Sequence, residues 1–262
     1  MHKKEKALIR FIQPLFAALG FLTIVPVPSL ICGTEDDLSR SLPWFVVVGA
    51  MIGTGAAFMD KALCYFLPVG PASAVTVLLL IAVSGGLHMD GLADTADGFF
   101  SSRPKSQMLD IMRDSRIGAM GVIAIVSVML LKFSLLSSMD DGTRFMVVFM
   151  IPVAGRFAPV FAIVTMKYVR GDAGLGTVFK KNASFFSLCT SFLLFLGVCF
   201  WAARYYGLII AVGTISLVAI FSFWCRRKIG GWTGDTLGAS VEISETGPPI
   251  IILIMAHTGI MT

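Results

Sequence analysis

The sequence predicts an all-α fold: a polytopic integral membrane helical bundle of about six full spans, with shorter apolar segments at its two ends. Hydrophobic residues make up 56% of the 262 residues, charged residues only 14%, and the mean hydropathy is +0.85. Because ordinary globular proteins carry about 25% charged residues, a soluble fold would leave a large apolar surface in water. A lipid bilayer is therefore the expected surrounding of this chain.

The charge balance is positive, with 21 Lys and Arg against 16 Asp and Glu and a formal net charge of +5. No basic run is interleaved with aromatic residues in a polar domain, so the excess does not indicate a nucleic-acid partner. The apolar content also excludes a disordered chain. We interpret the excess as the charge that orients the chain in its membrane.

Six apolar runs have the length of a span, since the hydrocarbon core needs about 20 helical residues. They cover residues 42–67, 72–87, 118–139, 145–166, 185–203 and 207–225. Two weaker runs lie at the ends of the sequence. The run 8–30 contains Arg10 and three prolines, and 249–262 is short for a span. We expect both weaker runs to be interfacial or re-entrant.

The connections between the runs predict a topology. Four segments, 1–40, 89–117, 167–184 and 225–248, hold 16 of the 21 Lys and Arg, whereas the opposing turns hold two arginines. By the positive-inside rule the four segments share the cytoplasmic face, which requires that the first apolar run does not cross. We therefore predict a single membrane domain, residues 1–262, with catalytic loops on the cytoplasmic face. A full first span with the basic loops outside is the alternative.

Three aspartates follow the second apolar run in the stretch GGLHMDGLADTADG, residues 85–98. On a helix, Asp90, Asp94 and Asp97 would lie within about 60° of one another on one face. Like charges at this spacing repel, and a divalent cation would compensate them at a membrane boundary. Oxygen ligands indicate Mg²⁺ or Mn²⁺, and the alternative is a solvated acidic loop. His88, on another face, is either a catalytic or a structural residue.

Further along the same connection, the stretch DIMRDSR places Asp110 and Asp114 four residues apart, with Arg113 and Arg116 beside the second acid. Acids that hold a metal, combined with guanidinium groups that bind phosphate oxygens, suit phosphate chemistry. The alternative is an exposed helix with surface ion pairs. We predict Asp110 as a further metal ligand and both arginines as substrate-binding residues.

Three other charged residues have unusual surroundings. Arg156 lies inside an apolar run, where a charge costs about 2.5 to 3.5 kcal/mol, so it should have an anionic partner. Arg170 lies in the glycine-rich segment 168–176, and Asp235 lies in the stretch GGWTGDTLGA, residues 230–239. Neither stretch is a Walker or dinucleotide fingerprint. We predict all three side chains as substrate-binding residues, with plain flexible loops as the alternative for the two glycine-rich stretches.

Together these stretches resemble the adenosylcobinamide-GDP ribazoletransferase family, also called cobalamin synthase. The family pattern reads close to GGLHxDGLADTADG, then IMxDSRxGxxG, then GGxTGDxLGA. All three motifs are present in this order, at residues 85–98, 111–121 and 230–239. The resemblance covers essentially the whole chain.

The resemblance implies a reaction, a cofactor and a location. Enzymes of this family join adenosylcobinamide-GDP to α-ribazole or its 5′-phosphate, release GMP, and complete the nucleotide loop of cobalamin, with Mg²⁺ as the expected cofactor. The expected partners are these substrates and the lipid bilayer, without nucleic acid, and an oligomer is left open. The implied location is the bacterial cytoplasmic (inner) membrane, as a multi-pass protein.

For this reaction, catalysis consists mostly of positioning and charge neutralisation. We assign the metal to Asp90, Asp94 and Asp97, and the role of general base to Asp114. The last assignment is open, because the spacing of Asp110 and Asp114 also resembles the paired acids of CDP-alcohol phosphotransferases, where Asp114 would be a metal ligand.

The rival function from another class is a transporter or channel, in which the acids and Arg156 would line a permeation path. Transport predicts charges near the midplane of broken helices, whereas most acids here follow the end of a span. A purely structural membrane subunit would leave the acids unexplained.

Overall fold

The computed structural model describes residues 3–28, 33–171 and 175–261, and within these ranges the regular elements are all helices, without β-strands. The helices are α1 (Lys3–Leu22), α2 (Glu35–Ser39), α3 (Phe45–Phe66), α4 (Val69–Ala82), α5 (Leu87–Phe100), α6 (Lys105–Ile111), α7 (Ala119–Ser137), α8 (Asp141–Thr165), α9 (Leu175–Asn182), α10 (Phe185–Ile229), α11 (Gly234–Glu245) and α12 (Gly247–His257). A short 3₁₀ turn, η1 (Leu42–Trp44), precedes α3. The predicted all-α class is confirmed.

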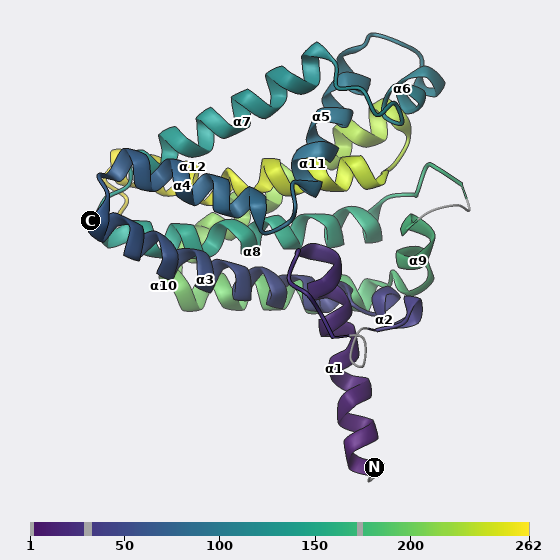
Figure 1. The fold of residues 1–262 in the computed structure, drawn as a ribbon, viewed down its shortest axis with the longest axis horizontal. Coiled ribbons are helices and arrows are strands. Elements are labelled where there is room, and N and C mark those ends of the chain that lie inside the picture. The colour runs from purple at the N-terminus through teal and green to yellow at the C-terminus, as the bar shows by residue number, and fades with distance from the viewer. Residues whose placement is uncertain (1–2, 29–32, 172–174, 262) are drawn as a thin grey trace.

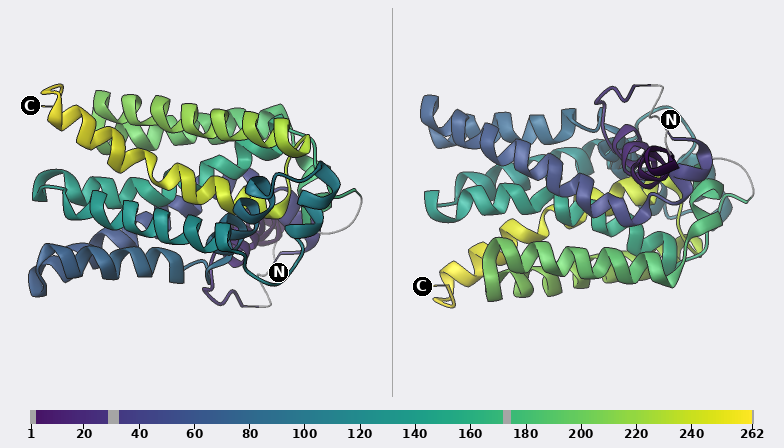
Figure 2. Two further views of the ribbon diagram at one scale, coloured as in Figure 1. Left: turned by 90° about the horizontal axis from the view of Figure 1, so that it is seen from above. Right: turned by 90° about the horizontal axis from the view of Figure 1, so that it is seen from below.

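The long helices run side by side along one axis (Figure 1, Figure 2). Among the described residues, five helical segments are long and apolar enough to cross a membrane, or six if α4 and α5 form one bent span. Helix α8 is buried along nearly its whole length, and α3, α10 and α11 pack around it. The structure therefore confirms a polytopic helical bundle, with α8 at its centre.

Helix α10 is a hairpin rather than one straight rod. Its helical geometry breaks at Ala203 and Arg204, where the φ of Arg204 is 50°. Near its start, the hydroxyl of Ser191 donates to the carbonyl of Leu42, and just beyond its end Trp232 packs in the same apolar cluster as Leu42. Both ends therefore lie at one end of the bundle, and the two spans predicted here, 185–203 and 207–225, are both present.

The second predicted span, 72–87, is shorter than expected. Helix α4 ends at Ala82, and Gly85 and Gly86 follow with φ values of 62° and 78°, in the left-handed region that favours glycine. The chain then turns by 86° into α5 (Figure 1). This break sends the acidic motif away from the direction of α4.

The C-terminal prediction was wrong in its extent. The run 249–262 was expected to be a short terminal segment, but α11 and α12 together make a span candidate from Gly234 to His257. Its mean hydropathy of 1.3 is the lowest of the five candidates because its first half contains polar and small residues. The basic connection before it therefore ends near residue 233 instead of 248.

The four basic segments gather at one end of the bundle, as predicted. Figure 1 shows α2, α6 and α9 at this end, and the C-terminus at the other. Helix α1 leaves the same end at a steep angle to the long helices and is not among the span candidates, which supports the expectation that the first apolar run does not cross. Arg144, one of two arginines counted in the opposing turns, is buried against Asp60. Because Asp60 neutralises Arg144, the difference in free positive charge between the two ends of the bundle is larger than the count of Lys and Arg suggests.

Candidate active site

The candidate site lies where α5 crosses the start of α11. The two helices touch through glycines: a Cβ on Gly91 would lie 2.7 Å from the carbonyl oxygen of Asp235 and 3.1 Å from the Cα of Gly238. Small residues at such crossings let helix backbones approach closely within a membrane. The glycines of two separate motifs therefore place Asp90 beside Asp235, and both residues line one cavity.

The predicted helix carrying the acidic motif is present as α5. The carboxylates of Asp90, Asp235 and Asp97, in decreasing order, all repel the charged form of Asp94. Asp90 is exposed, while Asp94 and Asp97 are half-buried. The acids of the first motif therefore lie in one electrostatic cluster, and the fold adds Asp235 from the third motif to it.

Asp97 has hydrogen-bond partners, whereas Asp90 and Asp94 have none among the residues that the structure describes. Its Oδ2 accepts a hydrogen bond from the backbone N–H of Gly118 at 2.7 Å, and its Oδ1 accepts one from Gly121 at 2.8 Å. These N–H groups belong to the first turn of α7 and have no acceptor within that helix. Asp97 thus caps α7 from a neighbouring helix, and each oxygen keeps a lone pair for another ligand.

A divalent cation fits part of the acidic cluster. Among the described residues, no three Asp, Glu, His or Cys side chains are grouped closely enough to hold a metal ion as they stand. However, Asp90 and Asp94 line one cavity and offer hard oxygen donors. Mg²⁺ commonly binds through one or two carboxylates and completes its shell with water and substrate phosphates. The magnesium site stays a prediction, for which Asp90 and Asp94 fit best.

Two cavities meet at Asp90. The first, which we call the aromatic cavity, measures about 460 Å³ and lies between α1, α3, α5, α8, α9 and α11, with Phe45 and Phe179 in its wall. The second, the acidic cavity, measures about 530 Å³ and lies between α5 and the start of α7, lined by Asp94 and Ser115 among others. Because Asp90 lines both, groups bound in the two cavities can meet beside its carboxylate.

The connection between α6 and α7 carries the predicted phosphate-binding residues, and its Ser115 and Ile117 line the acidic cavity. Asp110 and Arg113 are exposed and form no ion pair with any residue that the structure describes. The Nη2 of Arg116 lies 2.6 Å from Oδ2 of Asp114. Hydrogen bonds from the side chain and the backbone N–H of Arg116 lower the pKa of Asp114 to about 2. The surface pairing considered as an alternative is therefore present for this pair, while Arg113 is free to bind an anion.

Arg170 joins three connections at the basic end. Its Nη2 lies 2.5 Å from Oδ2 of Asp235 and donates to the carbonyl of Met112 at 3.2 Å. The adjacent backbone pairs with Trp232 in hydrogen bonds of 2.9 and 3.0 Å. The described parts of the two glycine-rich stretches are thus packed against each other, which disfavours the alternative of plain flexible loops. Residues 172–174 of the first stretch lie outside the described residues.

Arg156 has the anionic partner that was predicted for it. Its Nη1 lies 2.5 Å from Oε1 of Glu245, whose other oxygen lies 2.6 Å from the Nζ of Lys132. Lys132 also binds Glu242 at 2.6 Å. Two cations and two anions therefore compensate one another inside the bundle and tie α7, α8 and α11 together. Because Arg156 is only 1% exposed, this geometry favours support of α11 over direct contact with substrate.

His88 lies in the wall of the aromatic cavity. It is 5% exposed, and its Nε2 has no hydrogen-bond partner among the described residues. An unpaired buried polar atom is costly unless a ligand or water completes its hydrogen bonding. This geometry is compatible with contact to a substrate, and the predicted catalytic role remains untested.

Two buried ion-pair systems were not predicted from the sequence. Lys132 lies within the apolar run 118–139, and its partner Glu242 and the partner of Arg144, Asp60, lie on other helices. The carboxylate of Asp60 accepts hydrogen bonds from Nε and Nη2 of Arg144, at 2.8 and 2.7 Å. The available signal was an ionisable residue inside an apolar run, which predicts an oppositely charged partner on another helix.

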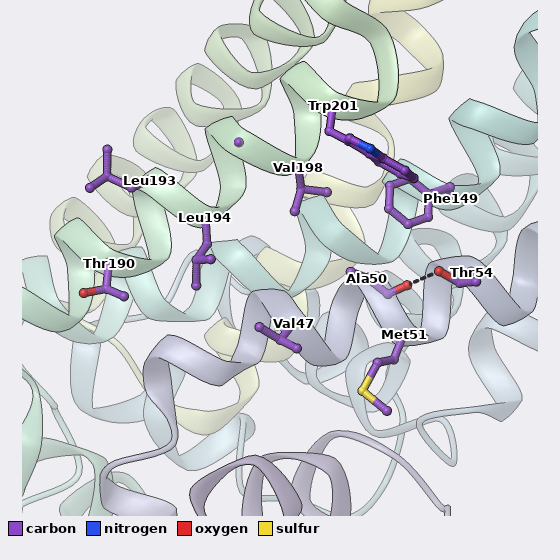
Figure 3. A pocket seen from close by; sticks show the side chains of 11 residues that line it. Val47, Ala50, Met51, Thr54, Phe149, Thr190, Leu193, Leu194, Val198 and Trp201 are labelled. Atoms are coloured by element: carbon purple, nitrogen blue, oxygen red, sulfur yellow. Dashed lines mark hydrogen bonds between the residues drawn. The ribbon is translucent and has the colours of Figure 1, made fainter. Parts of the chain in front are cut away.

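A larger cavity, about 710 Å³, lies away from these residues, between α3, α8 and α10 (Figure 3). Its lining is apolar apart from two threonines, and the hydroxyl of Thr54 donates to the carbonyl of Ala50 in its own helix. Trp201 closes it beside Phe149, with ring centroids 6.0 Å apart. This cavity offers no charged group for a phosphate, so it is not the candidate active site.

Comparison with known proteins identifies the chain's relatives. The family model described as cobalamin-5-phosphate synthase matches residues 14–254. The chain is 36% identical over 239 residues to the adenosylcobinamide-GDP ribazoletransferase of Acetivibrio thermocellus, covering 91% of this chain and 96% of the relative. It is 38% identical over 257 residues to the enzyme of the same name from Fusobacterium nucleatum, covering 87% of this chain and 92% of the relative.

No solved structure matches this chain. The relative from Desulforamulus reducens bears the same name and is 37% identical, over 90% of this chain and 94% of its own length. The family match spans α5, the α6–α7 connection and α11, which carry the acidic motifs and contribute to both cavities. The chain therefore belongs to the cobalamin-5-phosphate synthase family.

Proposed function

We propose that this chain is an adenosylcobinamide-GDP ribazoletransferase, which joins adenosylcobinamide-GDP to α-ribazole or its 5′-phosphate and releases GMP. The observation behind the proposal is the position of Asp90, at the junction of two cavities and beside Asp94 and Asp235. A transfer between two large substrates requires that both reach one phosphorus atom. Two cavities that meet at a carboxylate cluster satisfy this requirement.

In the proposed reaction, a ribose hydroxyl oxygen forms a bond to the phosphorus that carries the corrinoid. The bond from this phosphorus to the GMP oxygen breaks, and the hydroxyl proton is released. Such a displacement depends mainly on positioning and on stabilising negative charge. Mg²⁺ held by Asp90 and Asp94 would offset the charge of the diphosphate oxygens. Arg113 is exposed two residues before Ser115, which lines the acidic cavity, and would bind the leaving phosphate with its planar guanidinium.

The pairing of Asp114 with Arg116 bears on the predicted base. A carboxylate whose pKa is held near 2 is a weak proton acceptor at neutral pH. We therefore propose that Asp114 mainly orients Arg116 toward the phosphates, while the proton leaves to solvent or to another carboxylate of the cluster. Asp97 would contribute by fixing α7 against α5, and Arg170 by holding Asp235.

The buried charges argue against the transporter alternative. Arg144 is paired with Asp60 and Arg156 with Glu245, all at 4% side-chain exposure or less. Charges that are neutralised in this way do not line an open path. The exposed carboxylate of Asp90 instead faces cavities at the basic end of the bundle, where a soluble nucleotide can reach it.

We further propose that the basic end faces the cytoplasm and that the membrane is the bacterial inner membrane. The clustering of the basic segments at one end supports this orientation.

The proposed activity can be tested with the purified protein in detergent or nanodiscs. GMP release is measured from adenosylcobinamide-GDP with α-ribazole or its 5′-phosphate, with and without Mg²⁺. We expect release that requires both substrates and the metal. A variant outside the site, Trp201→Phe, serves as a control and should retain wild-type rates. No release by well-folded wild-type protein with either acceptor would refute the proposed reaction.

A further inference from the structure

The aromatic cavity has a composition that distinguishes it from the acidic cavity. The rings of Phe21, Phe45 and Phe179 contact one another, with centroid distances of 5.2 Å between Phe21 and Phe179 and 5.8 Å between Phe45 and Phe179. Trp232 adds a fourth ring to the lining. Flat heteroaromatic bases bind well to such rings because stacking and apolar burial both contribute. The cavity is therefore suited to a planar base.

One buried nitrogen in this wall lacks a hydrogen-bond partner among the described residues. His88 comes from the first turns of α5, is 95% buried, and its Nε2 makes no hydrogen bond with the described residues. Asp90 and Asp235 are the other ionisable residues that line the cavity, and Asp235 is already paired with Arg170. A ligand that fills the cavity therefore meets mostly apolar surface, together with the imidazole of His88 and the carboxylate of Asp90.

The two substrates of the proposed reaction differ in how well they fit this surface. The base of an α-ribazole is a benzimidazole, which is apolar apart from one ring nitrogen that is not bonded to the sugar. Guanine has several donors and acceptors on its edge, and burying them against phenylalanine rings would leave them unpaired at a cost of about 1–3 kcal/mol each. The cavity thus matches the acceptor base better than the guanine of the donor.

We propose, on the basis of the proposed function, that the aromatic cavity binds the base of the ribazole acceptor and that the imidazole of His88 donates a hydrogen bond to its free ring nitrogen. The ribose then extends toward Asp90, where the aromatic and acidic cavities meet, and the diphosphate lies in the acidic cavity. Phe179, on α9, limits the size of the base. This arrangement makes His88 and Phe179 determinants of acceptor specificity.

The first experiment measures KM for each substrate separately in full-length His88→Leu and His88→Gln variants. Loss of the hydrogen bond should raise KM for α-ribazole about tenfold, while KM for adenosylcobinamide-GDP stays unchanged. Glutamine, whose amide can still donate, should restore part of the affinity. An increase in KM for adenosylcobinamide-GDP instead would place guanine in this cavity and overturn the proposal, and so would unchanged KM values for both substrates.

The second experiment uses Phe179→Leu to enlarge the cavity. We expect the preference between a dimethylbenzimidazole riboside and a bulkier base riboside to shift toward the bulkier one. An unchanged preference would contradict the role of Phe179. Wild-type GMP release is measured first, so that failure of the proposed function is recognised independently of these variants.

A binding measurement covers the case in which the variants fold poorly. Adding α-ribazole alone to the wild-type protein should change the tryptophan fluorescence, because Trp232 lines the cavity. The change should disappear in Trp232→Phe and persist in Trp201→Phe, whose ring lies in the cavity of Figure 3. A change that persists in Trp232→Phe, or the absence of any change in the wild type, would contradict binding at this site.

Discussion

The carboxylate of Asp97 on α5 accepts a hydrogen bond from the backbone N–H of Gly118 at 2.7 Å. Asp97 therefore caps the start of α7. A Cβ on Gly118 would collide with this carboxylate, so glycine is required for the contact. Asp97 therefore differs from Asp90 and Asp94, although all three belong to one motif on one helix. The difference separates the predictions for these acids.

Asp90→Asn and Asp94→Asn should each reduce Mg²⁺-dependent GMP release by at least about a hundredfold, because the loss of a metal ligand removes several kcal/mol of transition-state stabilisation. Thermal stability should stay close to wild type, since neither side chain makes a hydrogen bond within the described residues. Asp141→Asn, an exposed acid at the opposite end, is the matched control. Near-normal turnover in both well-folded variants would refute the metal assignment.

Asp97→Ala should lower the free energy of unfolding by about 0.5–2 kcal/mol, the range measured for loss of a helix cap. The physical reason is that two N–H groups at the start of α7 lose their acceptor. Thermal unfolding in a fixed detergent measures the effect, with Asp94→Ala as the comparison. Equal melting temperatures for the two variants would show that the cap contributes little.

Arg113→Lys and Arg116→Lys should raise KM for adenosylcobinamide-GDP or lower kcat, since lysine keeps the charge but loses the planar, bidentate geometry. Arg113 should give the larger effect, because it has no carboxylate partner among the described residues while Arg116 is paired with Asp114. Steady-state kinetics with both substrates test this order. Wild-type kinetics in both variants would exclude phosphate binding by these residues.

Lys132→Met should destabilise the protein by about 3–5 kcal/mol, because it leaves Glu242 and Glu245 with only Arg156 to compensate them. The double variant Lys132→Met/Glu242→Gln keeps one anion and one cation and should recover part of this loss. Chemical or thermal unfolding of both variants measures the difference. A double variant less stable than the single one would contradict the proposed charge balance.

Cysteine labelling tests the orientation in the membrane. In a background without the five native cysteines, a cysteine at Arg103 should resist an impermeant reagent in intact cells. A cysteine at Tyr205, which is 77% exposed beside the break in α10, should be labelled from outside. The reverse pattern would place the basic end outside and would overturn the cytoplasmic assignment of the loops.

The sequence by itself determined the class of the fold, most of the spans and the end of the bundle at which the motifs lie. These properties depend on local composition: apolar length predicts a span, and Lys and Arg in the connections predict which segments share one side. The spacing of Asp90, Asp94 and Asp97 likewise predicted their common face, because helical periodicity alone fixes it. The resemblance of the motifs then indicated the family to which the chain belongs.

Only the tertiary structure decided which distant residues meet. Gly91 and Gly238 permit the crossing that joins Asp90 to Asp235, and Arg156 finds Glu245 across 89 residues of sequence. The last span was not predicted for the same reason, since its small and polar residues reduce its hydropathy but pack against α5 and α8. Hydropathy and periodicity describe one helix at a time. The cavities and buried ion pairs depend on how several helices pack, which no single segment specifies.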